Sequence, residues 1–78
     1  KVVDQAVVDQ AVQNWRMAKG KAGTGNHAFF MLGIGLQSSG LSQPDIKAIL
    51  HAEAVHGRSP KERLNQIPSI LQSLGMRT

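Results

Sequence analysis

The residues best suited to binding chemistry form a glycine-rich segment that runs directly into a helical pattern. Residues 20–25 read Gly-Lys-Ala-Gly-Thr-Gly, and an apolar pattern of helical type follows. Backbone N–H groups at a helix start have no partners inside the helix and carry partial positive charge, so they suit a phosphate group. Two interpretations remain open: a single phosphate contact, from DNA or a nucleotide, and an ordinary linker between helices. Four polar residues lie within or beside the segment and would assist a phosphate contact: Lys19, Lys21, Asn26 and His27.

The distribution of charge favours the phosphate interpretation. Nine Lys and Arg residues oppose five Asp and Glu residues, which gives a formal charge of +4 with neutral histidines. No acidic residue occurs from Gln10 to Pro44, whereas the same stretch contains Arg16, Lys19 and Lys21. A second basic region follows Gly57 and contains four cations and one acidic residue, Glu62. The cations are Arg58, Lys61, Arg63 and Arg77. If the two basic regions meet in space, they form one patch that contacts nucleic-acid phosphates without reading the base sequence.

Catalytic and metal-binding groups are not expected in this chain. His51, Glu53 and His56 form a suggestive group, but side chains five residues apart on a helix point about 140° away from each other. His51-Ala52-Glu53 matches the first half of the zinc-deaminase motif, His-x-Glu. The second half of that motif requires cysteines, and the chain has none. We interpret this group as a solvated polar face, and we expect neither a metal nor another cofactor. The serines lie at predicted helix caps and loop ends, and the glycine segment lacks the order of a Walker A loop.

Periodicity and helix-capping residues predict the elements that would position these residues. Apolar residues recur three and four positions apart near the N-terminus, where Val3, Val7, Ala11, Trp15 and Ala18 share one helical face. The aromatic residues follow the same periodicity, which indicates core packing rather than a base-stacking platform. The sequence therefore predicts an all-α, compact bundle of four to five short helices, at about residues 2–19, 26–39, 43–56, 60–66 and 68–74.

Glycine and proline set the expected boundaries between these helices. Gly40 suits a left-handed position just past a helix end, and Gly33 and Gly35 indicate that a neighbouring backbone approaches the second helix closely. Residues 59–62 read Ser-Pro-Lys-Glu, the form of a capping box with proline in the first helical position. Pro68 lacks an amide donor, so we expect a kink or a fresh helical start there.

Length and composition predict a single helical domain over residues 1–78. The chain lacks an initiator methionine and begins inside an apolar pattern, so we expect a domain excised from a longer protein. The longest apolar run, residues 28–36, is much shorter than the roughly 20 residues of a membrane span. No signal-peptide pattern is present. The absence of cysteine fits a reducing environment, and we expect a cytoplasmic location.

Three stretches of the sequence resemble the primase C-terminal (PriCT) helical domains of plasmid and phage replication primases. The stretches are Gly25-Asn26-His27-Ala28-Phe29-Phe30-Met31-Leu32, then Gly40-Leu41-Ser42 with Ile46 and Leu50, then Ile70-Leu71-Gln72-Ser73. The resemblance covers about residues 23–74, and it is greatest to the small primases of IncQ-type mobilisable plasmids, the RepB′ class. It implies a helix bundle from the C-terminal part of a replication protein, in which an upstream domain carries the polymerase carboxylates.

The resemblance also implies a function, which is to engage single-stranded template DNA or the initiating nucleotides during primer synthesis. Carried over to this chain, it designates Gly25, Asn26 and His27 as the contact region, to which the charge pattern adds Lys21, Arg58 and Lys61. One alternative is a protein-interaction module that docks a replicative helicase or the catalytic primase domain. A minor alternative is a helix-turn-helix-like binder of duplex DNA, because a short glycine-containing turn joins the second and third helices.

Overall fold

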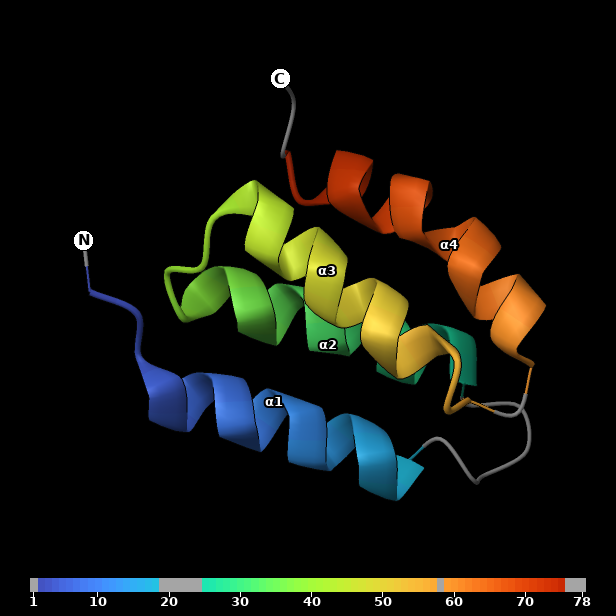
Figure 1. The fold of residues 1–78 in the computed structure, drawn as a ribbon, viewed down its shortest axis with the longest axis horizontal. Helices are drawn as coiled ribbons and strands as arrows, with labels where there is room; N and C mark the ends of the chain where they lie inside the picture. The colour runs from blue at the N-terminus through green and yellow to red at the C-terminus, as the bar shows by residue number, and fades with distance from the viewer. Residues whose placement is uncertain (1, 19–24, 58, 76–78) are drawn as a thin grey trace.

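The computed structural model describes residues 2–18, 25–57 and 59–75, and within these ranges it contains four α-helices and no strand (Figure 1). The helices are α1 (Gln5–Ala18), α2 (Gly25–Ser38), α3 (Gln43–Ala54) and α4 (Pro60–Ser73). Consecutive helices run in opposite directions (Figure 1). The predicted all-α bundle is confirmed. Within the described ranges, no helix combines the length and apolar character needed to cross a bilayer.

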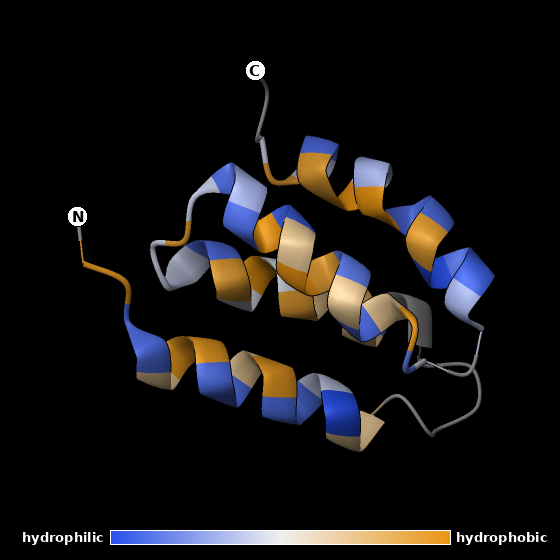
Figure 2. Cartoon of the chain, viewed as in Figure 1, coloured by the Kyte–Doolittle hydropathy of each residue, from blue (hydrophilic) through white to orange (hydrophobic). Residues whose placement is uncertain are grey.

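Helix α2 lies at the centre of the bundle and contacts each of the other three helices, as its apolar sequence predicts. Its Phe29, Leu32 and Leu36 side chains are fully buried. The rings of Trp15 and Phe29 pack with centroids 5.0 Å apart at an interplanar angle of 54°, so these aromatic residues serve the core. In Figure 2 the hydrophobic residues of α1 and α4 lie toward the middle of the bundle. The remaining large core side chains come from α3 and α4: Ile46, Leu50, Ile67, Ile70 and Leu71.

The two glycines inside α2 mark close approaches of neighbouring helices, as expected. A Cβ atom at Gly35 would lie 2.7 Å from the Cβ atom of Ala11 in α1. A Cβ atom at Gly33 would lie 2.7 Å from Cγ2 of Ile70 in α4. Both distances are shorter than real Cβ contacts, so glycine lets α1 and α4 pack tightly against opposite parts of α2.

Helix α1 begins at Gln5, not at residue 2 as the apolar pattern predicts. The reason is Asp4, whose carbonyl oxygen accepts hydrogen bonds from the N–H groups of Val7 and Val8, at 3.1 and 3.2 Å. The N–H of Asp4 itself donates to the carbonyl oxygen of Ser39 at 2.8 Å, which ties the chain to the turn after α2. The predicted core face is also partly wrong, because Val8 is buried in place of Val7.

Helix α4 is continuous through Pro68, although the sequence predicts a kink or a fresh start there and hence two helices. Proline removes the N–H that would bond the carbonyl oxygen of Leu64, four residues earlier. Both residues are on the exposed side of α4, so water can solvate that carbonyl. The buried Ile67 and Ile70 lie on either side of the proline, and their packing against the core holds one helix together.

The predicted helix starts and stops are otherwise close to those observed. Ser42 and Ser59 occupy the N-cap positions, and their carbonyl oxygens accept from Ile46 and Arg63 at 3.0 Å. Their side chains make no capping hydrogen bond, so the reciprocal bonds of a capping box are not formed. Gly40 has a φ of +94°, the left-handed conformation expected after α2.

Candidate nucleic-acid interface

Four helix termini meet at one end of the bundle, the right-hand end in Figure 1. They are the last turns of α1 and α3 and the first turns of α2 and α4, and we call this region the cationic end. The junction between α3 and α4 touches the other elements there. A Cβ atom at Gly57 would lie 3.4 Å from Cζ2 of Trp15 and 3.3 Å from Cγ of Arg63. The structure thus brings together the helix ends that flank both basic regions of the sequence.

The sequence places the whole net charge of the chain around these termini. Residues 16–27 and 53–63 contain six of the nine cationic residues and two of the five acidic ones. Their formal charge is therefore +4, equal to that of the entire chain. The other acidic residues, Asp4, Asp9 and Asp45, occur toward the start of α1 and at the start of α3, away from the cationic end. The sequence therefore concentrates the net positive charge in the segments that adjoin these helix termini.

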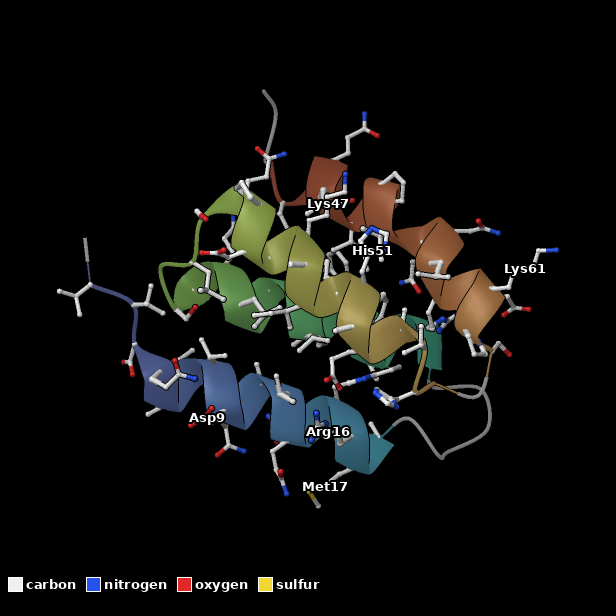
Figure 3. The ribbon with its side chains drawn as sticks, in the orientation of Figure 1. Asp9, Arg16, Met17, Lys47, His51 and Lys61 are labelled. Atoms are coloured by element: carbon white, nitrogen blue, oxygen red, sulfur yellow. The ribbon has the colours of Figure 1, made fainter. Side chains whose placement is uncertain are left out.

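Only part of the predicted contact region falls within the described residues. Gly25 and Asn26 begin α2, His27 is exposed in its first turn, and Lys61 is exposed in the first turn of α4. Figure 3 shows Lys61 projecting from the cationic end, well apart from Lys47 on α3. Three predicted contacts lie outside the described residues, namely Lys19, Lys21 and Arg58.

The start of α2 has the electrostatic character expected of a phosphate site. Its first turn contains no acidic residue. The N–H groups of that turn have no partner inside the helix, and they carry the positive pole of the helix dipole toward the cationic end. The first turn of α4 also faces this end, but it includes Glu62. An anion therefore gains more from the start of α2 than from the start of α4.

Arg16 is engaged in a bidentate ion pair, which the charge pattern did not reveal. Its Nε donates to Oε1 of Glu53 at 3.1 Å, and its Nη2 donates to Oε2 at 2.9 Å. The hydrogen bond to Glu53 and the negative charge of that carboxylate raise the pKa of Arg16. The two residues are 37 positions apart, so the pair joins α1 to α3. Arg16 therefore has a structural role.

The prediction of a solvated polar face on α3 is wrong for Glu53. This residue is only 6% exposed, whereas His51 and His56 are exposed. Among the described residues, no group of three His, Cys, Asp or Glu side chains is placed to hold a metal ion. The suggestive group in the sequence therefore divides into one buried structural carboxylate and two separate surface imidazoles.

Arg63, another cation of the second basic region, is also largely removed from solvent. It is 8% exposed, and its Nη2 lies 3.6 Å from Oε2 of Glu62. Its buried Nε has no hydrogen-bond partner within the described parts of the chain. Among the described cations at this end, Lys61 is thus the one that is exposed and forms no ion pair with another described residue.

A polar cleft of about 320 Å³ leads from His27 along the contact between α2 and α4. Phe30 and Ile70 contribute apolar surface, and the polar lining from α4 consists of Gln66, Ser69 and Ser73. These three residues recur at spacings of three and four, which puts them on one helical face. The sequence reasoning missed this stripe, although its periodicity was visible, because serines were interpreted only as helix caps. The volume is at the small end of the range for ligand pockets, about 300–1,000 Å³.

The chain matches no protein-family model, no curated protein and no solved structure.

Proposed function

We propose that this chain is a non-catalytic helical domain that binds single-stranded DNA through its cationic end. In this proposal it belongs to a DNA primase, where it engages template or initiating nucleotides while another part of the parent protein polymerises. The observation that carries the nucleic-acid part is the concentration of the chain's net charge around the termini that meet at the cationic end. The primase part rests on the sequence resemblance of residues 23–74.

Several features of the cationic end favour contacts to phosphate rather than to base edges. Lys61 supplies a flexible point charge, and the start of α2 supplies backbone N–H groups. These groups position a nucleic-acid backbone but carry no sequence information. The small cleft beside His27 has room for a group of about the size of one nucleotide, which a flexible single strand can present.

Duplex recognition by a helix-turn-helix is the weaker interpretation. In that motif the second helix inserts its N-terminal residues into the major groove. Here the corresponding helix is α3, whose first turn carries the exposed Asp45 next to Pro44. A carboxylate at this position repels the phosphates that flank the groove. The first turn of α3 also lies away from the cationic end (Figure 1).

Titration of a fluorescein-labelled oligo(dT) with the purified chain, followed by fluorescence anisotropy, tests the proposal. Binding to a single strand weakens with salt at a slope of about −0.7 in log K per phosphate contact. One lost contact therefore costs about fivefold in affinity near 0.1 M salt. We expect this loss for Lys61→Ala and a change of less than twofold for the matched control Lys47→Ala, also an exposed lysine on a helix.

Lys21→Ala and Arg58→Ala extend the same test to the two basic regions of the sequence. Each is expected to weaken oligo(dT) binding and to make the salt slope shallower by about 0.7. Absence of binding at low salt contradicts the proposal. So does binding that ignores both salt and these substitutions, because electrostatic contact to phosphates requires sensitivity to each.

A second candidate is a protein-interaction module that docks a replicative helicase or the primase catalytic domain. The observation that favours it is an apolar groove between α1 and α2. Under this alternative the groove binds protein and the affinity for oligo(dT) is close to zero. The same titration therefore distinguishes the two candidates.

A further inference from the structure

The cleft between α2 and α4, which begins at His27, has an apolar bottom and a polar rim. Ile70 is only 2% exposed, and the half-buried Phe30 packs against the core while it also lines the cleft. His27, Ser69 and Ser73 are exposed, so their polar side chains lie at the opening. A ligand that matches this arrangement has an apolar body and a polar edge.

Tertiary contacts between α2 and α4 hold the cleft in shape. Gly33 lets the two helices approach at the bottom, where its Cβ atom would lie 2.7 Å from Cγ2 of Ile70. Nε2 of Gln37 donates to the carbonyl oxygen of Leu74 at 2.8 Å, which joins the helices again next to Ser73. The lining residues of α4 span seven residue steps, about 10 Å at a rise of 1.5 Å per residue. The cleft is therefore a short depression between two packed helices and does not depend on a loop.

We propose that this cleft receives one unstacked base of a single DNA strand, held by apolar contact at the bottom and by hydrogen bonds at the rim. The inference rests on the proposed function, because a strand bound at the cationic end is what brings the base to the cleft. It adds a contact to a base, whereas Lys61 and the start of α2 contact phosphate alone.

The lining favours an uncharged group over a phosphate. None of the described residues that line the cleft is Lys, Arg, Asp or Glu. A phosphate placed there would leave water without gaining a cationic partner, which is unfavourable beside the apolar bottom. A nucleobase is neutral, its two faces are π surfaces that pack against apolar and aromatic side chains, and its polar atoms lie along its edges. These properties match an apolar bottom and a polar rim.

The rim does not require one particular order of donors and acceptors. A serine hydroxyl rotates to donate one hydrogen bond or to accept others, so Ser69 and Ser73 can each pair with different base edges. Apolar contact with the face of a base is likewise tolerant of sequence. We therefore expect the cleft to accept any base without a strong preference, and thymine is a suitable probe.

The position of the cleft suits a nucleotide whose phosphate is bound at the start of α2. His27 belongs both to the first turn of α2 and to the lining of the cleft. The backbone N–H groups of that turn suit a phosphate, and the base of the same nucleotide then extends toward Phe30. Lys61 precedes Gln66 by five residues, about 7.5 Å along α4, so it is close enough to contact a neighbouring phosphate of the strand.

A strand without bases separates this inference from the proposed function. The two probes are fluorescein-labelled oligo(dT) and an abasic strand of the same length, which carry the same number of phosphates. Each is titrated with the purified chain and followed by fluorescence anisotropy at several salt concentrations. We expect the abasic strand to keep the salt dependence of oligo(dT) but to bind at least about fivefold more weakly, the low end for the loss of a base contact.

Matched serine substitutions locate the base. Ser69→Leu fills the cleft at its rim, whereas Ser38→Leu makes the same change at an exposed helical serine that does not line the cleft. We expect Ser69→Leu to weaken binding of oligo(dT) at least about fivefold and to change binding of the abasic strand by less than about twofold. Ser38→Leu should change neither by more than about twofold. Ser73→Leu fills the same cleft from a second position, and circular dichroism checks that each variant is folded.

The outcomes distinguish the base contact from the phosphate contacts. Equal affinity for oligo(dT) and the abasic strand would overturn the inference and leave the proposed function standing. The inference is also wrong if the folded Ser69→Leu and Ser73→Leu variants bind oligo(dT) as tightly as Ser38→Leu does, or if they lose both strands equally. Failure of both strands to bind at low salt would overturn the proposed function and, with it, the inference.

Discussion

Exchanging one methyl group between α1 and α2 tests the packing on which both the core and the groove depend. The Cβ atom of Ala11 occupies the space that a Cβ atom at Gly35 would need, because the two would lie only 2.7 Å apart. Neither atom is the end of a flexible side chain, so a clash moves the helices themselves. The next contact of a Cβ atom at Gly35 is Cα of Ala11, at an ordinary 3.7 Å. Gly35→Ala is therefore tolerable only when residue 11 is glycine.

The magnitudes follow from helix propensity and packing. Ala11→Gly loses about 1 kcal/mol of helix propensity and about 0.8 kcal/mol for the buried methyl group, close to 2 kcal/mol in total. Gly35→Ala gains about 1 kcal/mol of propensity but costs about 2–3 kcal/mol of overpacking, a net loss of about 1–2 kcal/mol. In the double variant the propensity changes cancel and the overlap disappears, so the free energy of unfolding should return to within about 1 kcal/mol of the original.

The original chain, the two single variants and the double variant are unfolded by urea and by heat, each followed by circular dichroism. The free energies from urea give the coupling between the two sites. In the temperature scans we expect each single change to lower the thermal midpoint by roughly 4–8 °C for each 1 kcal/mol lost, and the double variant to recover most of the loss. The reasoning fails if Gly35→Ala alone stabilises the chain by its helix propensity. It fails equally if the two single effects simply add in the double variant.

Three further substitutions test separate features of the fold. Gly40→Ala should lower the free energy of unfolding by about 1–2 kcal/mol, because a residue with a Cβ atom is strained at a φ of +94°, and unchanged urea unfolding would contradict this. Pro68→Ala should raise stability by up to about 3 kcal/mol by restoring the N–H that bonds the carbonyl oxygen of Leu64, so an unchanged or lower thermal midpoint would count against the account of α4. Arg16→Ala should lower the thermal midpoint, because the buried Glu53 loses its bidentate guanidinium, and a midpoint equal to that of the original chain would show the pair to be dispensable.

Local signals predicted the helices well because each boundary depends on a few neighbouring residues. Pro60 at the start of α4 and Gly40 after α2 act through their own backbone conformations, so their effects can be recognised without knowing the fold. Pro68 gave the wrong expectation because its cost is local while the compensating burial of Ile67 and Ile70 is tertiary. A pattern within one helix cannot weigh that packing against a single lost hydrogen bond.

The candidate site was less accessible to prediction, because charges acquire partners only in the folded chain. The ion pair of Arg16 and Glu53 joins residues 37 positions apart, and no spacing rule signals it. Adjacent valines illustrate the same limit for packing. Val7 and Val8 are identical side chains, and the position of α2 decides that Val8 is buried while Val7 lines the groove. The meeting of four helix termini at one end likewise depends on the antiparallel arrangement of the helices.

Chemical-shift mapping of the ¹⁵N-labelled chain with unlabelled oligo(dT) tests the central claim most directly, because it locates the binding surface residue by residue. The account predicts that the largest amide shifts fall at the cationic end, in the first turns of α2 and α4, which include His27 and Lys61. Shifts near Lys47 and along the outer face of α1 around Asp9 should be small. Shifts centred on the groove between α1 and α2 or on the start of α3, or no shifts at low salt, would contradict it.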